Sequence, residues 1–273
     1  MTGTRCAVIT VVRGRHTYLA RQQAGLARMH RPPDARVLVA VGDPDIRGLA
    51  GAGSEIIELG CSTGALPLAQ ARNAGARRAL DGGAELLIFL DVDCIPSPSL
   101  VTDYLDAHHR AGGDALLCGP VTYLPPAPHG YDLDALGELT DPHPARPVPA
   151  PGELQVADDH DLFWSLSFAV SASGWRRIGG FCEEYTGYGG EDTDFAALAR
   201  VAGIPLLWVG GAHAYHQHHP VSSPPVEHVG DIVANSAVFR RRWGRWPMPG
   251  WLDQFEENGL LVRDGDRITL TAR

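Results

Sequence analysis

The sequence predicts a single α/β domain in which a mostly parallel sheet is covered by helices. Three observations lead there. Short β-branched runs alternate with segments of helical apolar spacing through the first half of the chain. The 273 residues are 44% hydrophobic and 20% charged, a composition that supports one sizeable core. Finally, no internal repeat or low-complexity linker divides the sequence.

Each element of the first half follows from its local pattern. Strands are expected at Cys6–Val12, Arg36–Val41, Glu55–Leu59, Leu86–Leu90 and Ala115–Cys118. Helices are expected at Tyr18–Met29, Pro67–Leu80 and Pro98–Arg110. The run Leu86–Leu90 is the most hydrophobic of the strands, so we expect it at the centre of the sheet.

In the second half the pattern breaks and then returns. Residues 125–160 are rich in proline up to Pro151 and lack periodicity, so we expect a flexible surface loop that serves as a substrate lid. Order then resumes at Leu162–Ser171, with a helix at Asp192–Ala202, a strand at Pro205–Val209, a helix at Val226–Arg242 and a hairpin of Leu260–Val262 with Arg267–Leu270. The division expected within the one domain is a nucleotide-sugar half (1–124), the loop (125–160), an acceptor and catalytic half (161–243) and a tail (244–273).

Composition excludes several classes of protein. The net charge of −9 argues against a general nucleic-acid binder. No apolar run approaches the roughly 18 residues of a membrane span, and Cys6–Val12 is too short for a signal sequence. Five cysteines without a C-x-x-C pair argue against a disulfide framework. We therefore expect a cytoplasmic protein.

The first chemical signal is Asp91-Val92-Asp93, directly after the most apolar strand. Ligands of open parallel sheets bind beyond the carboxyl ends of the strands, and two carboxylates there can hold a divalent cation with its phosphate ligand. The alternative is that the aspartates only cap the following turn. The preceding apolar strand favours the functional interpretation.

The second signal is Gly187-Tyr188-Gly189-Gly190-Glu191-Asp192-Thr193-Asp194. Glycines allow the backbone to approach a ligand closely, and the segment leads into a helix with three acidic residues in its first turn. Compensation of the helix dipole would account for one or two of those acids. Compensation of the helix dipole does not account for three acidic residues next to three glycines.

The third signal is a histidine cluster after the strand Pro205–Val209. His213, His216, His218 and His219 fall within seven residues, and His216 and His218 share one face if the segment is extended. Imidazole is a common metal ligand at neutral pH. A single histidine is more often an ordinary surface residue, but four in this position favour a metal site.

Together these residues resemble the GT-A glycosyltransferases, and within them family 2 enzymes with the C-terminal segment shared by β-1,4-galactosyltransferases and bacterial chondroitin-type polymerases. The resemblance covers nearly the whole chain. Besides the three signals, it rests on Thr10–Arg15, on Ala71-Arg72-Asn73-Ala74-Gly75 as the A-R-N-x-G element, and on Gly179-Gly180-Phe181-Cys182-Glu183 as a G-G-F-D-E block. The chain departs from the family at Cys182, at Tyr188 in place of tryptophan, and after the second strand, where only Asp43 matches.

The resemblance implies a Rossmann-like GT-A fold and a nucleotide-sugar donor, best a UDP-sugar of galactosyl or hexosaminyl type. It also implies Mn²⁺ or Mg²⁺ on the diphosphate, with Asp93 as the carboxylate ligand and His216 and His218 as imidazole ligands. His213 is a weaker candidate. The expected nucleotide-side residues are Thr10, Val12, Arg13, Arg15, Asp43, Arg72, Asp91, Val92 and Asp93. For each arginine, a plain surface salt bridge is an equal alternative.

The implied reaction is an inverting transfer, with Asp192 as the general base and Glu191 as a hydrogen-bonding partner of acceptor or donor sugar. The two adjacent carboxylates could exchange roles. We expect the helix start to keep Asp192 ionised at neutral pH. Tyr188 and Trp164 could stack on sugar rings, with Gly189 and Gly190 beneath the substrate, although core packing explains either aromatic residue equally well.

Other functions stay open at this stage. A nucleotidyltransferase also joins a nucleotide, a metal and D-x-D, and a non-catalytic sugar-nucleotide-binding protein or a metal store would use parts of the same set. The acceptor could be a carbohydrate, a lipid-linked molecule or a small molecule. The segment Arg240–Trp246 is basic and aromatic, which suits a lipid surface, but a helix docked on the sheet explains it better.

Overall fold

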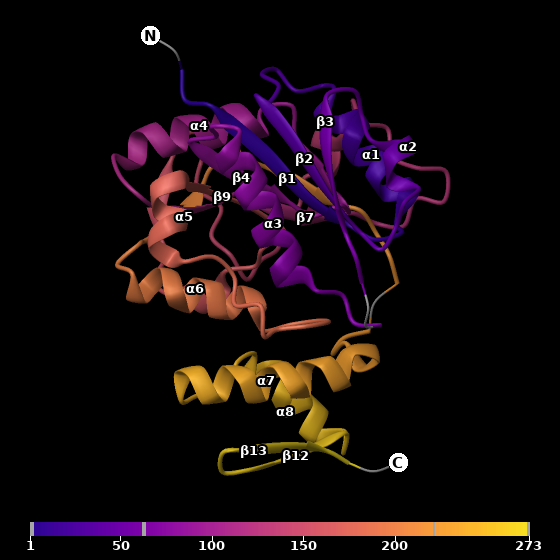
Figure 1. Ribbon diagram of the computed structural model, residues 1–273, viewed down its shortest axis with the longest axis vertical. Helices are drawn as coiled ribbons and strands as arrows, with labels where there is room; N and C mark the ends of the chain where they lie inside the picture. The colour runs from indigo at the N-terminus through magenta and orange to yellow at the C-terminus, as the bar shows by residue number, and fades with distance from the viewer. Residues whose placement is uncertain (1–2, 62–63, 221, 272–273) are drawn as a thin grey trace.

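The computed structural model describes residues 3–61, 64–220 and 222–271, which form an α/β body and a smaller C-terminal unit below it (Figure 1). We use the name C-terminal unit for residues 226–271. The α/β body contains every strand that was expected before residue 210, and the C-terminal unit contains two helices and a hairpin.

The body is built on an eight-stranded sheet with the order β3-β2-β1-β4-β9-β6-β10-β8. Its strands are β1 (Cys6–Val12), β2 (Ala35–Val41), β3 (Ser54–Leu59), β4 (Leu86–Leu90), β6 (Leu116–Cys118), β8 (Leu154–Val156), β9 (Ser167–Ser171) and β10 (Leu206–Val209). The strands β1 to β4 are mutually parallel, β10 is parallel to β6, and β9 runs antiparallel between β4 and β6. The fully buried β4 lies inside the sheet, which confirms the predicted central position.

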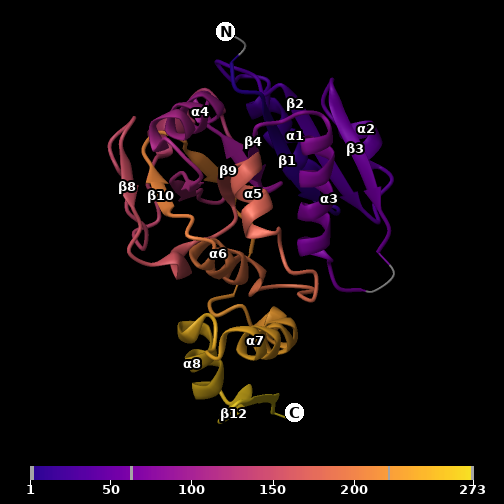
Figure 2. The same cartoon turned by 60° about the vertical axis from the view of Figure 1, so that its left-hand side comes forward.

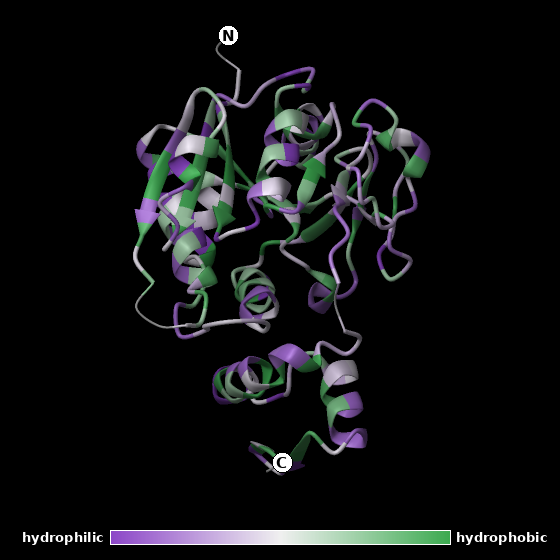
Figure 3. Cartoon of the chain, turned by 90° about the vertical axis from the view of Figure 1, so that its right-hand side faces the viewer, coloured by the Kyte–Doolittle hydropathy of each residue, from purple (hydrophilic) through white to green (hydrophobic). Residues whose placement is uncertain are grey.

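Helices cover both faces of this sheet (Figure 2). One face packs against α3 (Leu68–Asp81), α5 (Ala172–Ile178) and α6 (Glu191–Val201). The other packs against α1 (His16–Leu26), α2 (Ile46–Leu49) and α4 (Leu100–Ala111). Figure 3 shows the hydrophobic strands enclosed between helices whose outer sides are polar. None of the helices within the described ranges combines the length and apolar composition that a membrane crossing requires.

A second, three-stranded sheet was not predicted from the sequence. It has the order β5-β11-β7, made of β5 (Cys94–Pro96), β7 (Val121–Tyr123) and β11 (Ala214–His216). Three-residue strands are too short to show a period of two. This small sheet joins the chain just after D-x-D to the histidine segment.

The stretch 125–160 is more ordered than an open loop. It contains the 3₁₀ turns η1 (Leu136–Leu139) and η2 (His160–Leu162) and the edge strand β8. Leu136 packs with Tyr215 in a buried cluster, and Arg146 is 7% exposed. Closure of this segment over a substrate stays a prediction.

Residues 244–271, the described part of the stretch predicted as a tail (244–273), contribute to a packed unit. α7 (Val229–Trp243), α8 (Pro249–Glu257) and the hairpin of β12 (Leu261–Asp264) and β13 (Arg267–Leu270) share an apolar cluster centred on Ile232, Leu252 and Phe255. A short turn, η3 (Val226–His228), precedes α7. The hairpin confirms the predicted strand pair.

Candidate functional site

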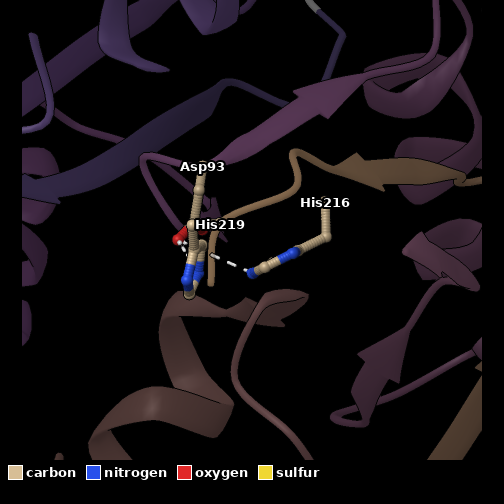
Figure 4. A group of neighbouring side chains, drawn as sticks. All are labelled: Asp93, His216 and His219. Carbon is tan, nitrogen blue, oxygen red and sulfur yellow. Dashed lines mark ion pairs between the residues drawn. The ribbon is translucent and has the colours of Figure 1, made fainter. Parts of the chain in front are cut away.

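The D-x-D turn and the histidine segment meet beyond the end of β4. The carboxylate of Asp93 lies 3.6 Å from His216 Nε2 and 3.5 Å from His219 Nε2. One ligand atom from each of the three residues lies within 4.8 Å of the others. Figure 4 shows the two imidazoles converging on the carboxylate. This spacing could hold a metal ion.

Backbone pairing fixes these residues relative to one another. In the small sheet, His216 of β11 is in register with Cys94 of β5, the residue after Asp93. The Gln217 backbone N–H also donates to the Asp93 carbonyl oxygen at 2.7 Å. Main-chain hydrogen bonds therefore hold Asp93 and His216 near one another.

The structure corrects the expected histidine pair. His219, and not His218, joins His216 beside Asp93. β11 ends at His216, so strand alternation no longer governs the residues that follow. His218 is exposed, while its backbone N–H donates to the Tyr131 hydroxyl at 3.0 Å. His213 hydrogen-bonds Thr122 at 2.8 Å and lies outside the group.

The donor set of this group suits a divalent cation. Asp93 is 6% exposed, and its Oδ1 has no hydrogen-bond partner among the described residues. Imidazole ligands favour Mn²⁺ over Mg²⁺, which prefers oxygen alone. Burial chiefly lowers the pKa of His216, so its ring stays neutral and able to ligate.

Arg15 supplies a positive charge to the same carboxylate. Its guanidinium donates to Asp93 Oδ2, and its side chain is 41% exposed. Burial raises the pKa of Asp93, but the hydrogen bond from His219, the neighbouring His216 ring and the charge of the Arg15 guanidinium outweigh it, so the pKa is lowered. Asp93 is thus held as a carboxylate.

A buried arginine links D-x-D to the acidic start of α6. Arg72 on α3 donates to Asp91 Oδ1 at 3.2 Å and to Glu191 Oε1 at 3.0 Å. Its side chain is 3% exposed and its guanidinium lies over the Phe181 ring. Desolvation raises the pKa of Asp91 to about 6 despite this partner. The A-R-N-x-G and D-x-D motifs therefore form one network with Glu191.

Asp192 lies at the first turn of α6, where the charge of Arg72 acts on it but no arginine of the described residues forms an ion pair with it. Its Oδ1 accepts from the Thr193 backbone N–H at 2.7 Å. Burial, followed by the charge of Glu191, raises its pKa to about 7. Desolvation and the neighbouring carboxylate thus oppose the helix start, which was expected to keep Asp192 ionised at neutral pH.

Several expected nucleotide-side residues have structural partners. Asp43 accepts from the Gly14 backbone N–H at 2.8 Å and from His16 Nε2 at 2.9 Å, which fixes the loop after β1. Thr10 donates to the Leu90 carbonyl oxygen at 3.0 Å and ties β1 to the end of β4. Arg13 donates to the Gly64 carbonyl oxygen at 3.2 Å. Val12 and Val92 are buried.

The two expected stacking residues lie in different surroundings. Tyr188 is 41% exposed and stacks on His228, with ring centroids 4.4 Å apart. Trp164 contacts the His143 ring edge-on at 4.9 Å and lies under the Arg146 guanidinium. His219 belongs to the histidine cluster recognised in the sequence but was not chosen there as a ligand. His228 and Trp251, the second aromatic neighbour of Tyr188, were not singled out from the sequence.

The mostly parallel α/β sheet, with D-x-D at the end of a central strand and an acidic helix start on the same edge, is similar in arrangement to the GT-A glycosyltransferases. Residues 154–220 match the family described as the N-terminal domain of galactosyltransferase.

Named relatives agree with this class. The chain is 34% identical to validoxylamine A glucosyltransferase of Streptomyces hygroscopicus over 157 residues, which cover 51% of this chain and 36% of that protein. It is 28% identical to chondroitin synthase of Escherichia coli over 177 residues, which cover 56% of this chain and 25% of that protein. The chain thus spans about a third or less of the length of these relatives.

Solved structures show the same fold. S. aureus TarS 1-349 in complex with UDP-GlcNAc superposes with a TM-score of 0.56 at 12% identity, covering 94% of this chain and 78% of that one. Its complex with UDP gives 0.53 at 16% identity, covering 86% and 65%.

Proposed function

We propose that this chain transfers a sugar from a UDP-sugar to an acceptor hydroxyl, with inversion at the anomeric carbon and with the help of Mn²⁺. The observation that carries the proposal is the convergence of two groups at one sheet edge. The Asp93–His216–His219 group and the Glu191–Asp192 pair are joined through Asp91 and Arg72.

On the donor side, Asp93, His216 and His219 would hold the cation. A bound divalent cation supplies positive charge against the charge that develops on a diphosphate leaving group. Arg15, already beside Asp93 and partly exposed, is placed to contact the same diphosphate. The buried network of Arg72 keeps Asp91 directed toward this edge.

On the acceptor side, Asp192 would accept the proton of the attacking hydroxyl. Glu191 is bound to Arg72, so it serves to orient Arg72 and the sugar rather than to take the proton. A pKa near 7 suits a general base, since such a group is available in its ionised form and still basic enough to accept a proton.

The donor class that we propose rests on the similarity of this chain to other proteins. The fold is shared with a UDP-GlcNAc complex of TarS, and one relative is named a glucosyltransferase, so UDP-hexoses and UDP-N-acetylhexosamines are the donors that we propose. The acceptor is a carbohydrate, lipid-linked or small-molecule hydroxyl, and we place the reaction in the cytoplasm without nucleic-acid partners.

A thermal-shift panel of nucleotide sugars with and without Mn²⁺ tests the proposal, because a ligand that binds the native state raises the melting temperature. We expect UDP-sugars to stabilise the protein only with Mn²⁺ present. Proton NMR of the product should then show an inverted anomeric configuration. Retention would refute inversion, and release of pyrophosphate from a nucleoside triphosphate and a sugar phosphate would favour a nucleotidyltransferase instead.

A further inference from the structure

A helix of the C-terminal unit holds the loop that precedes the two candidate catalytic carboxylates. Asn235 of α7 is 2% exposed. Its Nδ2 donates to the carbonyl oxygens of Thr186, Tyr188 and Gly189 at 2.9, 3.2 and 2.8 Å. Its Oδ1 accepts from the Thr186 backbone N–H at 3.3 Å. One side chain therefore bonds much of the loop 186–190 through its backbone.

The neighbouring turn of α7 contacts the same loop. Asp231 accepts from the Tyr188 backbone N–H at 3.2 Å. At Gly187, with φ of 73°, an added Cβ would lie 2.2 Å from Asp231 Oδ2. The glycine at this position is therefore required by the close approach of α7 as well as by the backbone angle.

The rings of the C-terminal unit also determine where Tyr188 lies. The Tyr188 ring stacks on His228 of η3 with an interplanar angle of 14°, and the Trp251 ring of α8 lies 6.0 Å away at 27°. Tyr188 precedes Glu191 by three residues, so the position of this loop fixes both the aromatic ring and the start of α6.

A buried carboxylate anchors the other side of the contact. Asp194 of α6 is fully buried and accepts from Arg242 Nε at 2.7 Å and from Trp243 Nε1 at 2.6 Å, both at the end of α7. Asn235 and Asp194 thus join α7 to the loop and to α6 within two turns of Asp192.

We propose that Asn235 is a positioning residue: it fixes the loop 186–190 so that Tyr188, Glu191 and Asp192 face the acceptor. The inference rests on the proposed transferase function, and it extends the acceptor side of the site to residues beyond the matched segment 154–220. Among the described residues, the hydrogen bonds of Asn235 all go to the loop 186–190, and none reaches the donor side formed by Asp93, His216 and His219.

The test compares Asn235→Ala with Ser236→Ala, its neighbour on α7. Ser236 is equally buried, and its hydroxyl has no hydrogen-bond partner among the described residues, so Ser236→Ala reports a loss of buried polar volume alone. Asn235→Asp keeps the acceptor oxygen but loses the three donations. Asp231→Ala removes a loop contact from a less buried position and is the variant to use if Asn235→Ala fails to fold.

The rate is measured as UDP release from the donor that the thermal-shift panel selects. We expect Asn235→Ala and Asn235→Asp to lower kcat by about 10- to 100-fold, because small displacements of reacting groups slow the reaction strongly. The KM for donor and the Kd for UDP with Mn²⁺ should stay within about twofold. Ser236→Ala should match the wild type. Equal effects of Asn235→Ala and Ser236→Ala, or an equal loss of UDP affinity, would overturn the inference.

Hydrogen exchange separates this inference from the proposed function. Amides of residues 186–190 should exchange at least about tenfold faster in Asn235→Ala than in Ser236→Ala, because the loop loses the bonds that hold its carbonyl oxygens and the Thr186 N–H and opens more often. If the wild type transfers no sugar, the proposed function fails, while the exchange rates still decide whether Asn235 holds the loop. Unchanged exchange contradicts the inference even in an active enzyme.

Discussion

Arg72 and Glu191 form an ion pair at 3.0 Å between α3 and α6, with side-chain exposures of 3% and 8%. The same guanidinium is bonded to Asp91. Glu191 is therefore paired with a buried cation, whereas the Asp192 carboxylate accepts hydrogen bonds only from its neighbour Thr193 within the described part of the chain. The two adjacent acids, indistinguishable in the sequence, have different surroundings in the fold.

Asp192→Asn should lower turnover by about 10²- to 10⁴-fold, the usual contribution of a positioned base. The amide keeps the size of the side chain but cannot take the proton. Binding of UDP with Mn²⁺, measured by calorimetry, should stay unchanged. Glu191→Gln should instead weaken sugar or acceptor binding. An active Asp192→Asn beside an inactive Glu191→Gln would mean that the roles are exchanged.

The pH dependence of the rate should report Asp192. Because burial raises its pKa to about 7, the ionised base is lost as pH falls below that value. We expect kcat/KM to fall about tenfold per pH unit well below pH 7 and to level off above it. The residual rate of Asp192→Asn should lack this step. A wild-type profile that is flat from pH 5 to 8 would contradict the assignment.

Paired histidine variants test the metal group. His219→Ala removes an imidazole beside Asp93 and should weaken Mn²⁺ binding on the order of tenfold or more. His218→Ala alters the adjacent, exposed ring and should leave the Mn²⁺ affinity unchanged. Titration calorimetry or paramagnetic relaxation measures both. The reverse pattern would restore His218 as the ligand.

Arg15→Gln should change metal and nucleotide binding in opposite directions. The Arg15 guanidinium occupies an Asp93 oxygen, so its removal should strengthen Mn²⁺ binding without nucleotide by about two- to fivefold, the range for a partly exposed ion pair. UDP binding with Mn²⁺ should weaken, because a cation near the diphosphate is lost. Arg13→Gln, whose guanidinium does not contact Asp93, is the control for Mn²⁺ affinity. If both affinities fall together, competition for Asp93 is ruled out.

Gly75→Ala tests the packing role of the A-R-N-x-G glycine. An added Cβ would lie 2.5 Å from Ile9 Cγ2 and 3.1 Å from Val39 Cγ2, so α3 would have to move off the sheet. We expect a loss of about 1–3 kcal/mol in the free energy of unfolding, measured in denaturant. Gly230→Ala, on an exposed part of α7 with nothing within 4 Å, should cost nothing.

The sequence predicts the central elements well because their signals are local and strong. β1 and β4 have the predicted bounds. D-x-D and Glu191–Asp192 lie at the edge of the sheet where parallel α/β sheets bind their ligands. These predictions depend on hydrophobic runs and on patterns of glycine and acidic residues. Such patterns can be recognised from residues that are close together in the sequence.

Other features depend on tertiary contacts that no local pattern contains. The choice of His219 follows from where β11 ends, and β11 exists only because it pairs with β5 and β7. The Arg15–Asp93 pair joins residues 78 positions apart. No sequence pattern distinguishes Asn235 from other helical residues, because its contacts depend on the packing of α7 against the loop 186–190.

The small sheet has a consequence for how the site would acquire its ion. Since the His216–Cys94 register and the Gln217–Asp93 backbone hydrogen bond hold Asp93 and His216 near one another, a cation that binds there would not have to draw these strands together. Chelators should then remove the ion without unfolding the chain. The cation that we propose would therefore be exchangeable between catalytic cycles and would not be needed for the fold.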